Sequence, residues 1–259
     1  MIYFGERIEL NVIIDVHAHI GCDHRFGFRL SAKDLVAAMD KYGITCSFIS
    51  SVKSLIYDYR EGNDDVEEAC IKYPKRLLGL AAIHPLYGEE ALKELRKRLS
   101  RKEFIGIKIH PFYFNTPANS PLMYPIVEEA IRMKAPLFIH SYDGGIEVSD
   151  LADRYPDAII VMYHMGGGDW EEGVLRVKKY ENVYVEMSSS FVDIGMVETA
   201  VEMLGEHRVL YGSDIPFQTP AISIAKVLEA NIPEYVKELI FYKNALNLFN
   251  LRGEYDRCF

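Results

Sequence analysis

The sequence contains no long apolar run and few cysteines. No window approaches the roughly 18 consecutive apolar residues that a transmembrane helix requires. Glu6, Arg7 and Glu9 interrupt the N-terminal segment where a signal peptide needs an apolar core. The four cysteines form no Cys-x-x-Cys pair, and in a chain of 259 residues we expect reduced thiols in the core. These absences predict a soluble, cytoplasmic protein.

An excess of positive charge is also absent. The chain has 29 Lys and Arg against 38 Asp and Glu, which gives a net charge of −9 with histidine neutral. A net-acidic surface repels phosphate groups, so we expect neither a nucleic-acid partner nor binding to an anionic membrane. One basic run, residues 93–102, has leucines at helical spacing and predicts the solvated face of an amphipathic helix.

No glycine-rich phosphate-binding turn follows the first apolar run, which argues against an open, doubly wound sheet. The chain has instead eight short and nearly continuous apolar runs, the pattern of strands buried on both faces. These predicted strands span residues 12–16, 44–49, 77–83, 104–109, 136–139, 158–163, 183–187 and 208–211.

Helical patterns alternate with the predicted strands. Ser31 and Asp34 have the spacing of a capping box at the start of one helix, and Asn63 is expected to open another. Eight alternating strand–helix pairs predict an α/β protein with a (β/α)8 TIM barrel. Because no linker or repeat interrupts the chain, we expect residues 1–259 to form a single domain, with an extra C-terminal helix over 233–250 packed outside the barrel.

Six of the eight histidines lie at or just past the end of a predicted strand. Barrel enzymes build their active sites at this face. A single histidine at such a position is more often a hydrogen-bonded core residue than a ligand. Six together indicate a metal or catalytic centre. They are His17, His19, His84, His110, His140 and His164.

The spacing of His17 and His19 predicts a metal site. Side chains two residues apart on a strand point to the same side, so both rings can bind one ion. Imidazole suits zinc, iron, nickel or copper better than magnesium or calcium. His140 ends the fifth strand and is the expected third ligand. Asp214 follows the eighth strand, which neighbours the first in a closed barrel, and is the expected carboxylate ligand.

These segments resemble the amidohydrolase superfamily. DVHAHI, GIKIHP, PLFIH, VMYHMGG, NVYVEMSS and LYGSDIP occur in this order, and the resemblance covers nearly the whole chain. More narrowly, the chain is similar to the branch that includes aminocarboxymuconate-semialdehyde decarboxylase, resorcylate-type decarboxylases and pyrone-dicarboxylate lactonases. The resemblance implies that His17, His19 and His140 are metal ligands. It also implies that His164 lies beside the metal and that Asp214 is the aspartate of the eighth strand.

The expected cofactor is one divalent transition metal ion, zinc first, with manganese or a second metal as alternatives. Such an ion lowers the pKa of a bound water to about 7, so hydroxide is available at neutral pH. Asp214 is then expected to accept the proton of this water and pass it to the leaving group. His164 is expected to polarise a substrate carbonyl or to hold the attacking hydroxide.

The roles of several neighbouring residues stay open. Lys108 and His110 lie two apart on the fourth strand, so both should face the barrel interior. In binuclear relatives a lysine at this place is carbamylated and bridges two metals; an unmodified Lys108 would bind a substrate carboxylate with His110. Arg25 and Arg29, in the first loop, are further candidates for binding a carboxylate. The face to which Glu186 points depends on the strand register.

The residues predict a metal-dependent hydrolase that attacks an amide, lactone or ester bond of a small carboxylated substrate. The alternative is a nonoxidative decarboxylase, in which the same ligands hold the substrate and a site acid protonates the carbon. A binding barrel without catalysis is a third hypothesis, which the complete ligand set disfavours. The expected partner is a small molecule, and a homodimer is a reasonable expectation for a soluble enzyme.

Overall fold

The computed structural model describes residues 12–250 and residue 258. Residues 1–11, on which the expectation of no signal peptide rests, lie outside this part of the chain. Within the described residues, no helix combines the length and the apolar character needed to cross a membrane.

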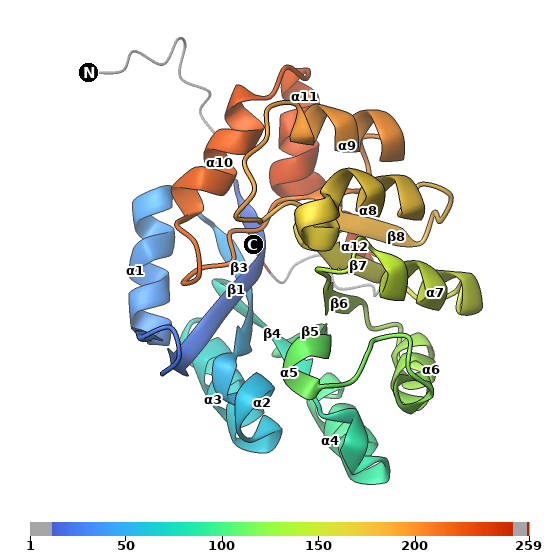
Figure 1. Cartoon of the computed structure of the whole chain (residues 1–259). Helices are drawn as coiled ribbons and strands as arrows, with labels where there is room; N and C mark the ends of the chain where they lie inside the picture. The colour runs from blue at the N-terminus through green and yellow to red at the C-terminus, as the bar shows by residue number, and fades with distance from the viewer. Residues whose placement is uncertain (1–11, 251–257, 259) are drawn as a thin grey trace.

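A nine-stranded sheet curls through the centre of the molecule (Figure 1), in the order β2-β1-β3-β4-β5-β6-β7-β8-β9. All pairings are parallel except that of β1 with β2. Each of the eight predicted strands corresponds to one parallel strand, and β2 is an addition. The strands are β1 (Ile14–Asp23), β2 (Phe28–Leu30), β3 (Cys46–Ser51), β4 (Leu77–Ala82), β5 (Phe104–Ile109), β6 (Leu137–His140), β7 (Ile160–Tyr163), β8 (Val183–Glu186) and β9 (Val209–Leu210).

Hydrogen bonds connect the segment that follows β9 to β1 at the other end of the parallel series. The backbone N–H of Asp214 donates to the carbonyl of His17 (2.8 Å), and that of His19 donates to the carbonyl of Ile215 (2.8 Å). The first and last parallel strands are therefore neighbours, as the barrel prediction requires. The curled α/β sheet is consistent with a TIM-barrel-like fold.

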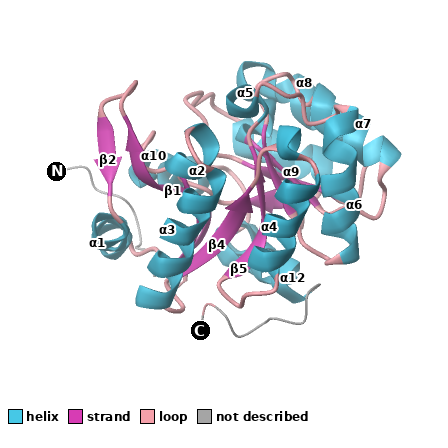
Figure 2. Cartoon of the chain, turned by 90° about the horizontal axis from the view of Figure 1, so that it is seen from below, coloured by secondary structure: helices cyan, strands magenta, loops and turns pink. Residues whose placement is uncertain are grey.

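Helices surround the sheet on its outer side (Figures 1 and 2), and the β1–β2 ribbon extends to one side of the body near α1. The helices are α1 (Ala32–Tyr42), α2 (Val52–Ile56), α3 (Tyr59–Lys72), α4 (Glu89–Leu99), α5 (Pro111–Phe114), α6 (Tyr124–Arg132), α7 (Ile146–Arg154), α8 (Trp170–Val177), α9 (Met196–Leu204), α10 (Pro220–Glu229), α11 (Glu234–Glu238) and α12 (Asn244–Asn250). Single turns of 3₁₀ helix span Pro85–Tyr87 and Pro121–Met123, a kinked 3₁₀ segment of six residues spans His164–Asp169, and a π-helical segment spans Leu239–Lys243.

The structure confirms one of the predicted helix starts and contradicts another. The capping box at α1 is confirmed, because the Ser31 hydroxyl accepts from the Asp34 N–H and the Asp34 carboxylate accepts in return. The predicted start of α3 at Asn63 is wrong. Asp58 caps that helix instead, and the buried Asn63 amide pairs with both backbone groups of Ala82 in β4. Asn63 therefore makes hydrogen bonds to a neighbouring strand and does not cap its own helix.

The predicted C-terminal helix over 233–250 is present but interrupted. A π-helical segment, Leu239–Lys243, separates α11 from α12. Its residues Leu239, Ile240 and Phe241 are buried, and the Tyr211 N–H after β9 donates to the Ile240 carbonyl. Packing against the sheet therefore alters the helical turn at this position.

The two larger hydrophobic cores of the described residues lie on the two sides of the sheet. The outer core fills the space between strands and helices. The inner core lies within the curl of the sheet and includes Phe48, Phe138 and Tyr163, together with Leu246 and Leu248 of the C-terminal helix. Three cysteines (Cys46, Cys70 and Cys258) are buried, as expected for core thiols, whereas Cys22 is half-buried.

A bulge in β1 decides which way its two histidines point. The side chains of Ile14 and Val16 belong to the inner core, whereas Ala18 belongs to the outer core. The register of β1 against β3 shifts within this stretch, so the alternation of faces reverses there. As a result, His17 and His19 both face the interior of the curled sheet.

Candidate metal centre

Three donor atoms converge where β1 meets the segment after β9. His17 Nε2 and His19 Nε2 lie 3.1 Å apart, and Asp214 Oδ1 is 3.4 Å from the first nitrogen and 3.3 Å from the second. All three residues are buried. Metal–ligand bonds of 2.0–2.1 Å in a tetrahedral site place neighbouring donors about 3.3 Å apart. The donor set therefore fits a divalent transition metal ion.

The opposite nitrogen of each of these rings is already engaged. His17 Nδ1 lies 3.1 Å from Glu186 Oε2 and 3.2 Å from Ser188 Oγ, and His19 Nδ1 lies 2.9 Å from Ser50 Oγ. Glu186 therefore points inward, which the sequence left undecided because it did not give the strand register. A carboxylate on Nδ1 favours the tautomer that carries its proton there and leaves Nε2 free to bind a metal.

His164 and His140 form a hydrogen-bonded pair beside this group. His164 Nδ1 lies 2.7 Å from the carbonyl oxygen of Ser188, which can only accept, so Nδ1 carries the proton. His164 Nε2 then accepts from His140 Nδ1 at 3.0 Å. This assignment leaves His140 Nε2 unprotonated and able to act as a ligand. His140 is not among the three converging residues. It is linked to them through His164, whose ring lies 5.0 Å from that of His17.

A second group of donors shares His17. His17, His164 and Glu186 offer ligand atoms within 4.8 Å of one another, as His17, His19 and Asp214 also do. Glu186, however, already accepts hydrogen bonds from the N–H and the hydroxyl of Ser188. The group with Asp214 is therefore the better candidate for a metal, and Glu186 the better candidate for holding His17 in place.

The histidine rings are neutral in this environment. Burial lowers the pKa of all five, and the pKa of His164 falls to about 4; the positive charge of Lys108 adds to this effect at every ring. Neutral imidazole is the form that binds metal ions, so the protonation state suits a metal centre at neutral pH. The five are His17, His19, His110, His140 and His164.

Lys108 and His110 both face the interior beside the histidines. Lys108 Nζ lies 3.1 Å from His17 Nε2 and 4.0 Å from the centre of the Tyr163 ring, and burial lowers its pKa to about 7. His110 stacks on His140 at 3.9 Å, and its Nδ1 accepts from the Tyr113 N–H at 3.4 Å, at the start of α5. Both residues are therefore close enough to the centre to take part in it.

The centre opens into a cavity of about 610 Å³ whose wall is largely aromatic. Polar groups of the centre, including His19, His164 and Asp214, lie on the same wall. Such a mixture of apolar surface and few polar groups is typical of a small-molecule site. The aromatic residues are Phe26, Phe112, Tyr113, Tyr142 and Phe217.

Arg25 lines this cavity in a fixed orientation. Its Nε and Nη2 donate to the two carboxylate oxygens of buried Asp23, at 3.0 and 2.6 Å. Its guanidinium carbon lies 4.6 Å from the centre of the Tyr113 ring. Because Asp23 binds one edge of the guanidinium, the N–H donors of the other edge remain available for a ligand.

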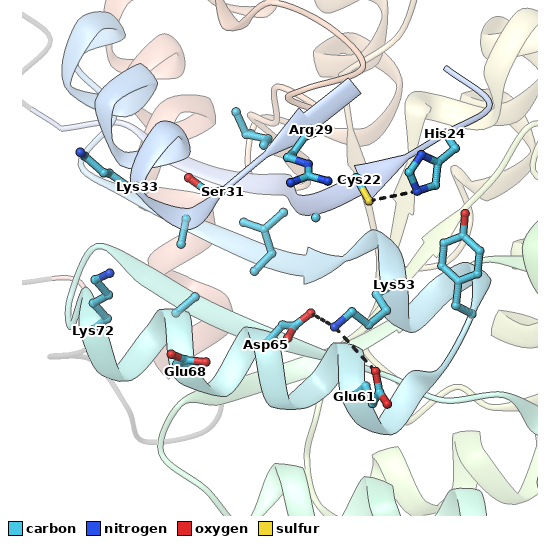
Figure 3. A pocket seen from close by; sticks show the side chains of 16 residues that line it. Cys22, His24, Arg29, Ser31, Lys33, Lys53, Glu61, Asp65, Glu68 and Lys72 are labelled. Carbon is cyan, nitrogen blue, oxygen red and sulfur yellow. Dashed lines mark hydrogen bonds and ion pairs between the residues drawn. The ribbon is translucent and has the colours of Figure 1, made fainter. Parts of the chain in front are cut away.

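Arg29 lines a different cavity. This cavity, of about 760 Å³, lies between the β1–β2 ribbon and helices α2 and α3 (Figure 3). His24 lines it as well, and Lys53 at its edge pairs with Asp65 at 2.8 Å and with Glu61 at 3.8 Å. None of the six strand-end histidines lines it, so Arg29 has no part in the centre.

Two of the residues expected to be catalytic have a left-handed backbone. Asp214 has φ of 56° and His164 has φ of 61°, and Met165 follows with 55°. A residue with a Cβ adopts this conformation rarely, and such strain concentrates at functional sites. No local signal in the sequence announces this conformation.

Comparison with known proteins identifies the family. The sequence model of the amidohydrolase family matches residues 14–251. The chain belongs to the amidohydrolase family. The expected resemblance is confirmed, and several curated relatives of this amidohydrolase are decarboxylases.

Two of these relatives differ in name and in sequence identity to this chain. Gamma-resorcylate decarboxylase of Polaromonas sp. is 25% identical over 282 residues, covering 83% of this chain and 86% of the relative. 2-Amino-3-carboxymuconate-6-semialdehyde decarboxylase of Dictyostelium discoideum is 22% identical, covering 73% of this chain and 65% of the relative. Both relatives are decarboxylases by name.

Solved structures agree on the fold. A dihydroxybenzoic acid decarboxylase from Polaromonas sp., with bound manganese and the inhibitor 2-nitroresorcinol, superposes with a TM-score of 0.77 at 20% identity, covering 93% of this chain and 98% of that one. The 2,6-dihydroxybenzoate decarboxylase from Rhizobium gives 0.74 at 20% identity, covering 94% and 99%. These values support the TIM-barrel-like amidohydrolase fold.

Proposed function

We propose that this amidohydrolase is a metal-dependent decarboxylase of a small aromatic carboxylic acid. The observation that carries this proposal is the convergence of His17, His19 and Asp214 at the wall of an aromatic-lined cavity of about 610 Å³. The names of the curated relatives support decarboxylation rather than hydrolysis. A benzene ring between the aromatic side chains of the wall would hold its carboxylate toward the metal centre.

We infer that one divalent transition metal ion is held by His17, His19 and Asp214, with His140 as a further ligand through its free Nε2. Zinc remains the sequence-based prediction, and manganese is the ion found in relatives. When bound, the ion would act as a Lewis acid on the substrate oxygens. A second metal, carried by a carbamylated Lys108, stays an alternative.

The residues around the ion would orient the substrate and move one proton. The guanidinium of Arg25 is poised to pair with a negative group of the substrate. Asp214 faces the histidines through Oδ1, and its other oxygen is the proposed carrier of the proton. Asp214 would take this proton from solvent and pass it to the ring carbon that bears the carboxylate. The bond from that carbon to the carboxyl carbon would then break, its electrons would return to the ring, and carbon dioxide would leave. Neutral His164, whose two ring nitrogens are engaged by Ser188 and His140, would orient His140 beside the ion.

The remaining features of this proposal follow from the sequence. We propose that the whole chain forms one closed barrel domain, which the hydrogen bonds between β1 and the segment after β9 support. A homodimer and a cytoplasmic location stay predictions.

The test measures two products in parallel. The enzyme, loaded with zinc or manganese, is incubated with 2,6-dihydroxybenzoate, 5-carboxyvanillate and related hydroxybenzoates, and separately with aryl esters, lactones and amides. We expect release of carbon dioxide together with an equal amount of the phenol. Asp214→Asn should lower kcat by about 10²–10⁴-fold, whereas Asp169→Asn, exposed on the kinked turn before α8, should not.

Hydrolysis of an ester, lactone or amide without carbon dioxide release would restore the hydrolase hypothesis. Absence of both activities in protein that binds stoichiometric metal would favour a binding role instead. Protein that binds no transition metal would refute the proposed centre altogether.

A further inference from the structure

A pair of cysteines lies in the inner core, far from the metal centre. Cys46 begins β3 and is fully buried, and Cys258 is 4% exposed. Their sulfur atoms are 2.6 Å apart, although 212 positions separate them in the sequence. Both residues belong to the same cluster as Ile14, Phe48 and Leu248. The tertiary structure has therefore brought together two thiols that lie far apart in the sequence.

We propose that Cys46 and Cys258 form a disulfide, so that this pair departs from the reduced thiols expected from the sequence and position 258 is fixed to the inner core. The two sulfur atoms are in direct contact inside the folded chain, which is the juxtaposition that a disulfide requires. The other two cysteines lack this opportunity. Cys70 lies in the outer core, and Cys22 lies 3.8 Å from the His24 ring.

The surroundings favour a structural bond over a reactive thiol. The inner core around the pair is apolar. Burial and the neighbouring Cys258 raise the pKa of the Cys46 thiol well above its ordinary value. A thiol of this kind is a poor nucleophile and a poor metal ligand in the folded protein. Bond formation is therefore expected during folding, before the two side chains are fully enclosed.

The oxidant would be a small disulfide such as oxidised glutathione. The thiolate of Cys258 attacks one sulfur of the small disulfide and releases one small thiolate, which leaves a mixed disulfide. The thiolate of Cys46 then attacks the Cys258 sulfur and releases the second small thiolate. Two protein thiols are oxidised to one disulfide, one small disulfide is reduced to two thiols, and the protons of the protein thiols pass to the released thiolates.

This bond should stabilise the fold without changing the metal centre. It closes a loop that spans most of the chain, which restricts the unfolded ensemble. Cys46 lies at the start of β3, whereas Ser50, which contacts His19, lies near the end of the same strand. The two sites are therefore at opposite ends of the strand, and metal binding is expected to be the same in both redox states.

The experiment counts thiols in the full-length protein after refolding with oxidised glutathione. Alkylation with iodoacetamide under denaturing conditions should modify two cysteines, and four after reduction. Proteolysis without reduction should release a cross-linked peptide pair that contains Cys46 and Cys258. Reduction should lower the Tm of the wild type by about 5–15 °C. Cys258→Ser should abolish this redox dependence, whereas Cys22→Ser should keep it.

Four alkylated cysteines after treatment with oxidised glutathione would overturn the proposal, as would a cross-link that includes Cys22 or Cys70. The thiol count uses the wild-type chain, so its outcome does not depend on whether a variant folds. It also needs no substrate, so its failure is separate from any failure of the proposed decarboxylase.

Discussion

At the candidate metal centre, single residues set the orientation and charge of the donor rings through hydrogen bonds to the ring nitrogen opposite the donor atom. His17 has Glu186 and Ser188 on its Nδ1, and His19 has Ser50. His164 is oriented by the Ser188 carbonyl. Partners of this kind fix the tautomer and the direction of each ring, so a change in a partner should alter metal affinity while every ligand stays in place.

Glu186→Gln tests this arrangement. The substitution keeps the size of the side chain but removes the negative charge behind His17 Nδ1. We expect the affinity for zinc or manganese to fall about 10–100-fold, as measured by competition with a chromogenic chelator. Glu172→Gln, on the exposed face of α8, is the matched control and should bind metal like the wild type. An unchanged affinity in Glu186→Gln would show that this carboxylate does not support the ligand.

Asp15 should make stability depend on pH. Its carboxylate accepts from the N–H groups of His17 and Ser213 and from the Ser213 hydroxyl, and burial raises its pKa from 3.8 to about 7. Because the folded pKa lies above the unfolded one, its contribution is complete below pH 4 and is lost as the pH rises through 7. Asn at this position does not titrate.

The expected difference appears between pH 5 and pH 8 in protein freed of metal. Over this interval the free energy of unfolding of the wild type should fall by about 2–3 kcal/mol relative to that of Asp15→Asn, as measured in urea. Parallel changes in both proteins would mean that the carboxyl of Asp15 ionises in the folded protein at its ordinary pKa.

At the scale of helices and strands, the positions of α2 and α3 depend on close packing between them, which local sequence signals predict only in part. Helices α2 and α3 pack so closely that a Cβ added at Gly62 would lie 2.2 Å from the backbone nitrogen of Ser54. The start of α3 at Asp58 and the position of Asn63 beside β4 belong to the same packing. Glycine is required at position 62 because the other helix occupies the space, although its φ is ordinary.

Gly62→Ala should therefore destabilise the protein, although alanine is the better helix former. We expect a loss of about 1–3 kcal/mol in the free energy of unfolding, because the two helices must move apart. Glu68→Ala, at an exposed position of the same helix, should change it by less than about 0.5 kcal/mol. A gain in stability for Gly62→Ala, measured by urea unfolding, would contradict the close packing of α2 and α3.

At the scale of the whole molecule, the candidate metal centre joins the two ends of the parallel series of strands. His17 and His19 come from β1, and Asp214 follows β9. An ion bound by all three would therefore stabilise the fold as well as take part in the chemistry. Asp214 lies almost 200 positions from the two histidines in the chain, so an unfolded chain cannot present the three ligands together.

Removal of the metal should lower Tm, and its return should raise Tm again as the site fills. At a free concentration of zinc or manganese 100 times the Kd, the ion should add about 2.7 kcal/mol to stability, which raises Tm by roughly 5–10 °C. His19→Ala should show little of this shift in a thermal melt at the same metal concentration. A rise of equal size in His19→Ala would place the stabilising ion elsewhere.

Much of this architecture could be predicted from local patterns. Each of the eight predicted strands matches a parallel strand, because apolar β-branched runs have few other stable environments. The start of α3 could not be predicted, since Asn63 and Asp58 are equally good capping residues in isolation. The inward direction of Glu186 also required the register of β8, which neighbouring strands determine.

The sequence by itself determined the alternation of strands and helices, the strand-end histidines and the family, because these depend on residue types and spacings along the chain. The tertiary structure decided which donors face one another. The bulge in β1 turns His17 and His19 inward, and the curl of the sheet brings Asp214 beside them. It likewise brought Cys258 to Cys46. Contacts between distant segments depend on packing and register, and no local pattern encodes either.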